Sequence, residues 1–87
     1  MVYLISYEIA DKEREAKLVE DIKSSGDYCN PINNQWFISV NQGALSTYQR
    51  LIQHLNTSDK LLIAEITRKR EALLDKDCIE WLKAHGA

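Results

Sequence analysis

The chain has 87 residues, 45% of them hydrophobic and 28% charged, with a formal net charge of −2. These totals are typical of one soluble globular domain with a modest core, and they argue against a disordered chain. The acidic balance disfavours non-specific binding to a nucleic acid backbone, which needs a basic surface.

No apolar run of about 18 residues is present, so we expect no membrane-spanning helix. The opening residues lack a basic segment followed by an apolar core and a cleavage site. We therefore expect no signal peptide and a cytoplasmic location.

The first predicted element is a strand at residues 2–9, VYLISYEI. Its side chains alternate between two faces, and both faces are mainly apolar, which is typical of a strand in the middle of a sheet. A helix at about residues 12–25 follows, with Asp11 as a candidate N-cap and an apolar stripe along one side. Gly26 is the glycine expected just after the helix ends.

The middle of the chain predicts two strands and a second helix. Residues 27–31 form a short strand at a sheet edge, because Pro31 cannot donate to a ladder. After an Asn–Asn turn, residues 35–40, QWFISV, form a second interior strand. The helix at about residues 44–56 has the clearest periodicity in the chain, with apolar side chains three or four positions apart.

The last third predicts a strand at residues 60–67, KLLIAEIT, which is apolar on both faces apart from one glutamate. The basic run at residues 68–70 ends this pattern. A final helix begins at Asp75 or Asp77 and ends near His85.

The order of these elements predicts an α+β fold: a ferredoxin-like βαββαβ sandwich with an added C-terminal helix, built as one domain by residues 1–87. Right-handed crossovers place both amphipathic helices on one face of the sheet. The other face then carries apolar residues, and a bare apolar face is typical of a partner site. We expect the C-terminal helix to cover part of it and a second copy of the chain to cover the rest.

Two groups of charged residues are candidates for chemistry. Glu8, near the end of the first strand, is a candidate catalytic residue and metal ligand, because hard divalent cations bind carboxylate oxygens. Two copies of Glu8 in a dimer could flank one metal, although an isolated carboxylate more often has a structural or solvated role. Arg68, Lys69 and Arg70 are candidate contacts for phosphates or for a partner. The alternative for this run is a solvated turn that protects a strand edge.

Four aromatic residues lie on the two predicted interior strands. In RNA-binding sheets of this topology, exposed aromatic rings stack on bases. QWFISV lacks the glycine and the basic residue of that module, so we expect core or dimer packing instead. The four residues are Tyr3, Tyr7, Trp36 and Phe37.

The cysteines and histidines show no motif. Cys29 and Cys78 are far apart in the sequence, and we interpret them as reduced, half-buried thiols, with a disulfide as the alternative. His54 and His85 lack metal-ligand spacing, and we expect both at the surface. No phosphate-binding glycine loop, paired-cysteine motif or nucleophile elbow occurs, so we expect no cofactor.

Short segments along nearly the whole chain resemble a known group. ISYEI at the end of the first strand resembles the hydrophobic-Ser-Tyr-Asp-hydrophobic opening of the small CRISPR-associated integration-scaffold proteins, the ferredoxin-like partners of the CRISPR integrase. VapD-type toxin ribonucleases share that fold. IKSSG, WFISV, DKLLIAEI and WLK look like landmarks, in the same order, of short bacterial and phage proteins catalogued as SinR-like.

The resemblance implies a homodimer formed through the sheets. In some members of the CRISPR-associated family, an Asp at the end of the first strand is associated with metal-dependent phosphodiester cleavage, so the resemblance also implies this activity. In others the protein holds DNA as a scaffold. Glu8 occupies that position here, a departure that moves the carboxylate oxygens by roughly one methylene.

Our first hypothesis is therefore a small homodimeric binding module that acts by protein or nucleic acid contact in a bacterial or phage defence, toxin or mobile-element system. An antagonist of a CRISPR complex is one such role. The alternative is a metal-dependent endoribonuclease or nuclease in which Glu8 binds Mg²⁺ or Mn²⁺. A third hypothesis is a nucleic acid scaffold held by Arg68 and Arg70.

Overall fold

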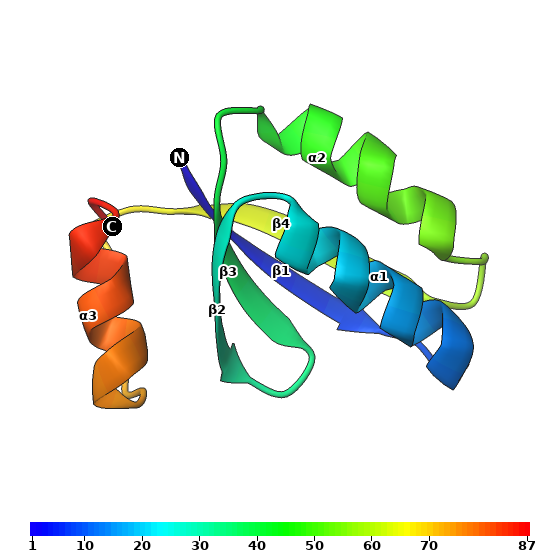
Figure 1. The fold of residues 1–87 in the computed structure, drawn as a ribbon, viewed down its shortest axis with the longest axis horizontal. Coiled ribbons are helices and arrows are strands. Elements are labelled where there is room, and N and C mark those ends of the chain that lie inside the picture. The colour runs from blue at the N-terminus through cyan, green and yellow to red at the C-terminus, as the bar shows by residue number, and fades with distance from the viewer.

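Four strands and three α-helices follow one another in the predicted order, and the computed structural model describes residues 1–87 (Figure 1). The elements are β1 (Val2–Glu8), α1 (Lys12–Ser24), β2 (Asp27–Ile32), β3 (Gln35–Ser39), α2 (Ala44–Leu51), the 3-10 turn η1 (Ile52–His54), β4 (Lys60–Ile66) and α3 (Lys76–Ala84). The predicted α+β, ferredoxin-like fold with an added C-terminal helix is confirmed. No helix combines the length and the apolar character needed to cross a membrane.

The sheet has the strand order β2-β3-β1-β4, and every neighbouring pair is antiparallel. β1 is an interior strand that pairs with β3 through Tyr3↔Ile38 and with β4 through Ile5↔Ile63. β3 is the other interior strand, and β2 and β4 form the two edges. Both predicted interior strands and the predicted edge position of β2 are therefore confirmed.

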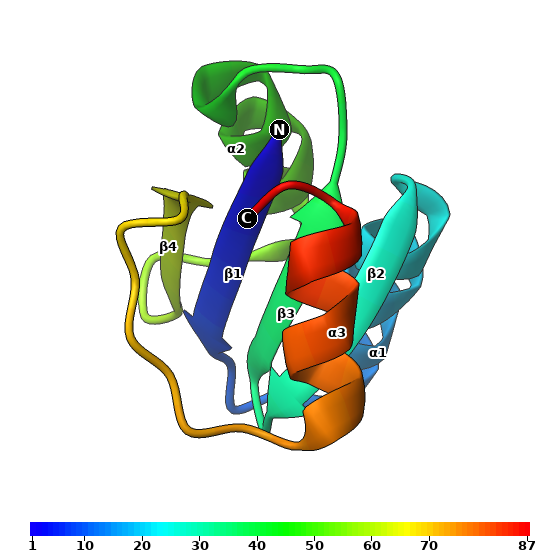
Figure 2. The same cartoon turned by 90° about the vertical axis from the view of Figure 1, so that its left-hand side faces the viewer.

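Both crossover helices lie on one face of the sheet, and α3 lies on the other (Figure 2). The main core forms between the sheet and α1 and α2. Ile5 and Ile38 of the sheet are fully buried there, together with Leu18 and Ile22 of α1 and Leu51 of α2. Each such side chain contributes roughly 1.5–3 kcal/mol when it leaves water, so this layer dominates the stability of the fold.

The aromatic residues of the interior strands lie inside the protein. Tyr3, Tyr7 and Trp36 belong to the main core, and Phe37 packs in a second cluster on the opposite face. All four side chains are buried. The prediction that they are packing residues, and not an exposed stacking surface for bases, is confirmed.

The two ends of α1 use the predicted residues, but one of them has another role. The carboxylate of Asp11 caps the helix by accepting hydrogen bonds from the backbone N–H groups of Glu13 (2.8 Å) and Arg14 (3.2 Å). Gly26 follows the helix, yet its backbone is not left-handed. A Cβ at Gly26 would overlap the carbonyl oxygen of Ser39, so the close approach of the chain to β3 requires glycine.

The second helix is shorter than its apolar periodicity predicts. α2 ends at Leu51 and continues only as η1, whereas the spacing predicts a helix as far as residue 56. The backbone N–H of Leu55 donates to the carbonyl oxygen of Ile52 (3.1 Å), an i→i+3 bond that tightens the last turn. The backbone N–H of residue 56 then donates to Oδ2 of Asp59 (2.9 Å), which turns the chain into β4.

Candidate partner interface

The sheet face opposite α1 and α2, called here the second face, is apolar where β1 and β4 run side by side. Leu4 lies opposite Ala64 and Ser6 lies opposite Leu62 in the antiparallel register. Side chains alternate along each strand, so these residues point away from the main core. The sequence pattern predicted such a face, and the structure shows how much of it is covered.

α3 covers the β2–β3 side of the second face. Leu82 is fully buried in a cluster with Val2 and Phe37. The Trp81 ring stacks on Phe37 with a centroid distance of 6.3 Å and an interplanar angle of 16°. The expectation that the C-terminal helix covers part of this face is confirmed.

A disulfide between Cys29 and Cys78 joins β2 to α3, which corrects the interpretation of these residues as reduced thiols. The two cysteines are 49 residues apart in the sequence. They meet because Cys29 points to the second face and Cys78 lies on the buried side of α3. The chosen interpretation failed because cysteine spacing alone does not show where a C-terminal helix docks.

An apolar groove of about 310 Å³ remains open on the second face beside α3. Residues 67–75, called here the strap, run from β4 to α3 (Figure 2), and residues 70–74 of the strap form one wall of the groove. On the same face, outside the groove, Leu62 of β4 is 58% exposed. Within the groove, Ile32 on β2 is 51% exposed and Leu73 in the strap is 99% exposed. Further lining residues are Leu4, Phe37, Ile66, Leu74 and Leu82.

The outer edge of β4 carries no hydrogen-bond partner. β4 pairs only with β1, and no backbone hydrogen bond outside the regular elements involves residues 60–66. The strand has seven residues, no proline and no register shift. Natural edge strands are usually blocked by a short length, a proline or a bulge. β4 has none of these, so its free edge is suited to pairing with another strand.

The β2 edge is protected in the ways that the β4 edge is not. Its register with β3 shifts between Cys29 and Ile32, around Pro31. The side-chain amide of Asn30 also donates to the carbonyl oxygens of Ile32 (2.9 Å) and Gln35 (2.7 Å), which fixes this irregularity. Only one edge of the sheet is therefore available for strand pairing.

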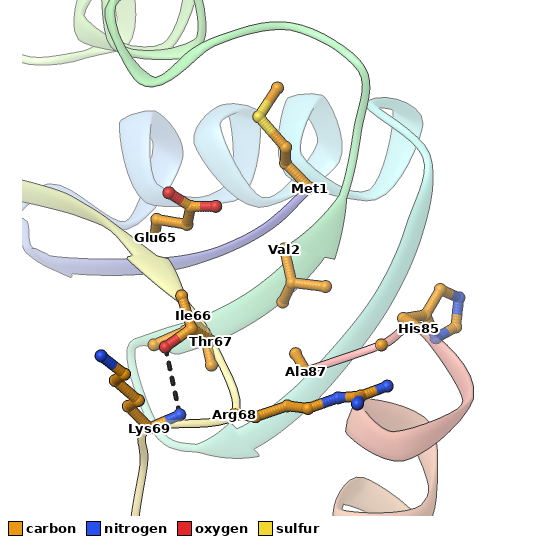
Figure 3. A pocket seen from close by; sticks show the side chains of 10 residues that line it. Met1, Val2, Glu65, Ile66, Thr67, Arg68, Lys69, His85 and Ala87 are labelled. Carbon is orange, nitrogen blue, oxygen red and sulfur yellow. Dashed lines mark hydrogen bonds between the residues drawn. The ribbon is translucent and has the colours of Figure 1, made fainter.

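The basic run does not form one cluster of cations. Arg70 is half-buried, and its Nη2 donates to the carbonyl oxygen of Ala87 (2.9 Å) while its Nε is buried without a partner. Arg68 and Lys69 are exposed and line an open cavity of about 510 Å³. Their side chains point away from each other there, and Glu65 lies on the same cavity (Figure 3).

Glu8 lies at the far end of the β1–β4 ladder from the basic run. Its side chain is 76% exposed, and its Oε1 is 3.8 Å from Nζ of Lys60, the residue opposite it on β4. No three His, Cys, Asp or Glu residues of one chain lie close enough together to hold a metal. A single chain thus offers a cation fewer than three such ligands at this point, which does not fit the oxygen-rich shell of Mg²⁺ or Mn²⁺.

Both histidines have partners, which corrects the interpretation of them as plain surface residues. Nε2 of His54 is 2.8 Å from Oδ2 of Asp21, whose Oδ1 accepts a hydrogen bond from Nε of Arg50 (3.0 Å). This network ties α1 to α2 and η1. No sequence signal links these residues, because the chain positions are 29 and 33 apart.

His85 is part of the contact between α3 and the sheet. Its ring stacks on Trp81 with a centroid distance of 4.0 Å, and its Nε2 is 3.1 Å from Oδ2 of Asp27 on β2. The pKa of His85 is raised by the nearby backbone carbonyl of Trp81 and by the Asp27 carboxylate. The i, i+4 spacing of Trp81 and His85 is a signal that the sequence offered for this contact.

The fold has a solved relative. No family model matches the chain, and no curated protein sequence does. The crystal structure of a hypothetical protein, TT1823, from Thermus thermophilus matches with a TM-score of 0.64 and 24% sequence identity, over 83% of this chain and 88% of that one. At this identity the likeness shows the fold alone.

Proposed function

We propose that the protein is a homodimeric binding module that works by protein contact, without catalysis, in a bacterial or phage defence, toxin or mobile-element system. Antagonism of a CRISPR complex in the cytoplasm is one role of this kind. The observation that carries the proposal is the open half of the second face next to an unprotected β4 edge.

The chemistry of this surface favours protein over nucleic acid. The groove is lined mainly by aliphatic and aromatic side chains, which leave water readily on contact with another apolar surface. A phosphate backbone needs several converging cations, whereas Arg70 bonds within its own chain and Arg68 and Lys69 diverge. The overall charge of −2 points the same way.

A second copy is the partner that the edge fits best. An antiparallel strand edge can pair with its own copy across a twofold axis, which gives both chains the same new ladder. Such a dimer also brings two exposed Leu62 side chains into the interface. The resemblance to proteins that dimerise through their sheets supports the same arrangement.

The test compares two matched substitutions by sedimentation equilibrium. Leu62→Lys places a charge on the β4 edge, and Leu45→Lys places the same charge at a site on α2 that is 68% exposed. We expect twice the 10.0 kDa chain mass for wild type and Leu45→Lys, and a shift to monomer for Leu62→Lys. A wild-type protein that stays monomeric at high micromolar concentration would overturn the proposal, and so would a dimer insensitive to Leu62→Lys.

The nuclease alternative rests on the position and exposure of Glu8 at the end of β1. Because one chain supplies fewer than three such ligands there, this alternative requires Glu8 from both copies of a dimer. Labelled RNA and DNA would be incubated with Mg²⁺, Mn²⁺ or a chelator. Metal-dependent cleavage that disappears in Glu8→Gln would replace the proposal.

A matched control for Glu8→Gln exists on α3. Glu80 also lies 3.8 Å from a lysine, Lys76, and is largely exposed. Cleavage lost equally in Glu80→Gln would reflect a general loss of charge or an impurity, and no cleavage of any substrate would leave the binding module in place.

A further inference from the structure

We infer that the Cys29–Cys78 disulfide is a redox latch that determines whether α3 stays on the second face. This inference rests on the proposed function, because α3 covers part of the face through which the dimer would form. The bond joins an edge strand of the sheet, β2, to the last helix of the chain, and it is the only covalent link between them outside the backbone.

The half of α3 near the latch has few other anchors. Cys78 is the third residue of the helix, and the N-cap residue Asp75 makes no side-chain hydrogen bond to it. The strap, which precedes the helix, makes no backbone hydrogen bond to the sheet. No backbone hydrogen bond outside the regular helices and strands involves residues 67–74. A helix of nine residues is too short to persist on its own in water.

The other half of α3 is held by contacts that do not need the latch. Leu82 is buried against Val2 and Phe37, and His85 is 3.1 Å from Asp27. Together with the stacking of Trp81 on Phe37, these contacts keep the C-terminal half of α3 on the sheet. Loss of the disulfide therefore releases the N-terminal half of α3 together with the strap.

Release would enlarge the apolar surface available to a partner. Leu4, Phe37 and Ile66 line the open groove, and the strap forms one of its walls. Once the strap is released, the groove loses that wall and becomes a wider apolar patch across β3, β1 and β4. Reduction of the latch should therefore strengthen self-association.

The chemistry is a thiol–disulfide exchange with a dithiol reductant. A thiolate of the reductant attacks Sγ of Cys29, the more exposed of the pair, and Cys78 leaves as a thiolate that takes up a proton. The second thiol of the reductant then resolves the mixed disulfide, so two electrons pass to the protein and the reductant becomes a cyclic disulfide. In a reducing cytoplasm, disulfides that do form are usually transient and redox-sensing.

The test is hydrogen exchange of the folded protein with and without dithiothreitol, beside the Cys29→Ser/Cys78→Ser variant. We expect α3 amides to exchange roughly tenfold or more faster in the reduced protein and in the variant, while β1 and β3 amides are unchanged. The variant should not respond to dithiothreitol. Unchanged α3 amides on reduction would overturn the latch, and equal acceleration in β1 and β3 would show a general staple instead.

Sedimentation of the same samples separates the two proposals. A dimer that tightens on reduction, and that is equally tight in the variant, supports control of the interface by the latch. A dimer of unchanged affinity, with α3 exchanging faster, overturns that control. Absence of a dimer in both redox states overturns the proposed function. The exchange rates of the α3 amides still test whether the disulfide holds α3 on the sheet.

Discussion

Replacing Leu82 by alanine tests whether α3 is packed on the sheet as the structure shows. Leu82 is fully buried between α3 and the second face, in contact with the cluster that contains Val2 and Phe37. The substitution removes three carbons, each worth about 0.8 kcal/mol of transfer free energy, so about 2.4 kcal/mol is lost from burial alone. The cavity left behind raises the expected loss to about 3 kcal/mol.

A matched leucine on the strap provides the control. Leu73 is 99% exposed, so Leu73→Ala should change the free energy of unfolding by less than about 0.5 kcal/mol. The same estimate can be expressed as a melting temperature. For 87 residues the entropy of unfolding is about 0.18 kcal/mol/K, so the loss of about 3 kcal/mol in Leu82→Ala should lower Tm by about 16 °C.

Both variants would be compared by urea and thermal unfolding followed by far-UV circular dichroism, without reductant. A loss below about 1 kcal/mol for Leu82→Ala, or an equal loss for Leu73→Ala, would mean that α3 does not pack on the second face. The reasoning about the latch would then fail as well, because it depends on the same docking.

Three further outcomes are expected. The Trp81 carbonyl and the Asp27 carboxylate raise the folded pKa of His85, so the stability that these contacts give the protonated ring is complete below about pH 6.5 and is lost as pH rises through the folded pKa. His85→Gln should remove this pH dependence from thermal unfolding curves. Gly26→Ala should destabilise the protein by about 1–3 kcal/mol in urea unfolding, because its Cβ meets the Ser39 carbonyl oxygen, and a neutral result would contradict the close approach. Gly43→Ser should stabilise by a few tenths of a kcal/mol, since α2 lacks a side-chain N-cap, and a lower Tm would contradict that assignment.

Local pattern predicted most of the architecture. The alternation in VYLISYEI and QWFISV identified the two interior strands and assigned each side chain to a face, because side-chain direction in a strand depends only on position. The spacing in α1 and α2 and the handedness of crossovers then placed both helices on one face. Each of these inferences needs only neighbours in sequence and one rule of geometry.

Most of the features that were missed join distant parts of the chain. Cys29 meets Cys78, and His54 meets Asp21, only after α3 and η1 have docked. The same holds for Arg70, which lies in a basic run in the sequence but donates a hydrogen bond to Ala87 in the folded chain. Such contacts depend on the tertiary arrangement, and no spacing or residue type in the sequence encodes them.

Trypsin should cut the strap, since its exposed Arg68 and Lys69 lie in a segment without backbone hydrogen bonds to the sheet. Every cut there leaves Cys29 on one fragment and Cys78 on the other. The oxidised protein would therefore keep its full mass on a non-reducing gel after digestion, and the two fragments would separate once the bond is reduced. After cleavage of the strap, the redox state of the disulfide can therefore be read from the size of the bands on a non-reducing gel.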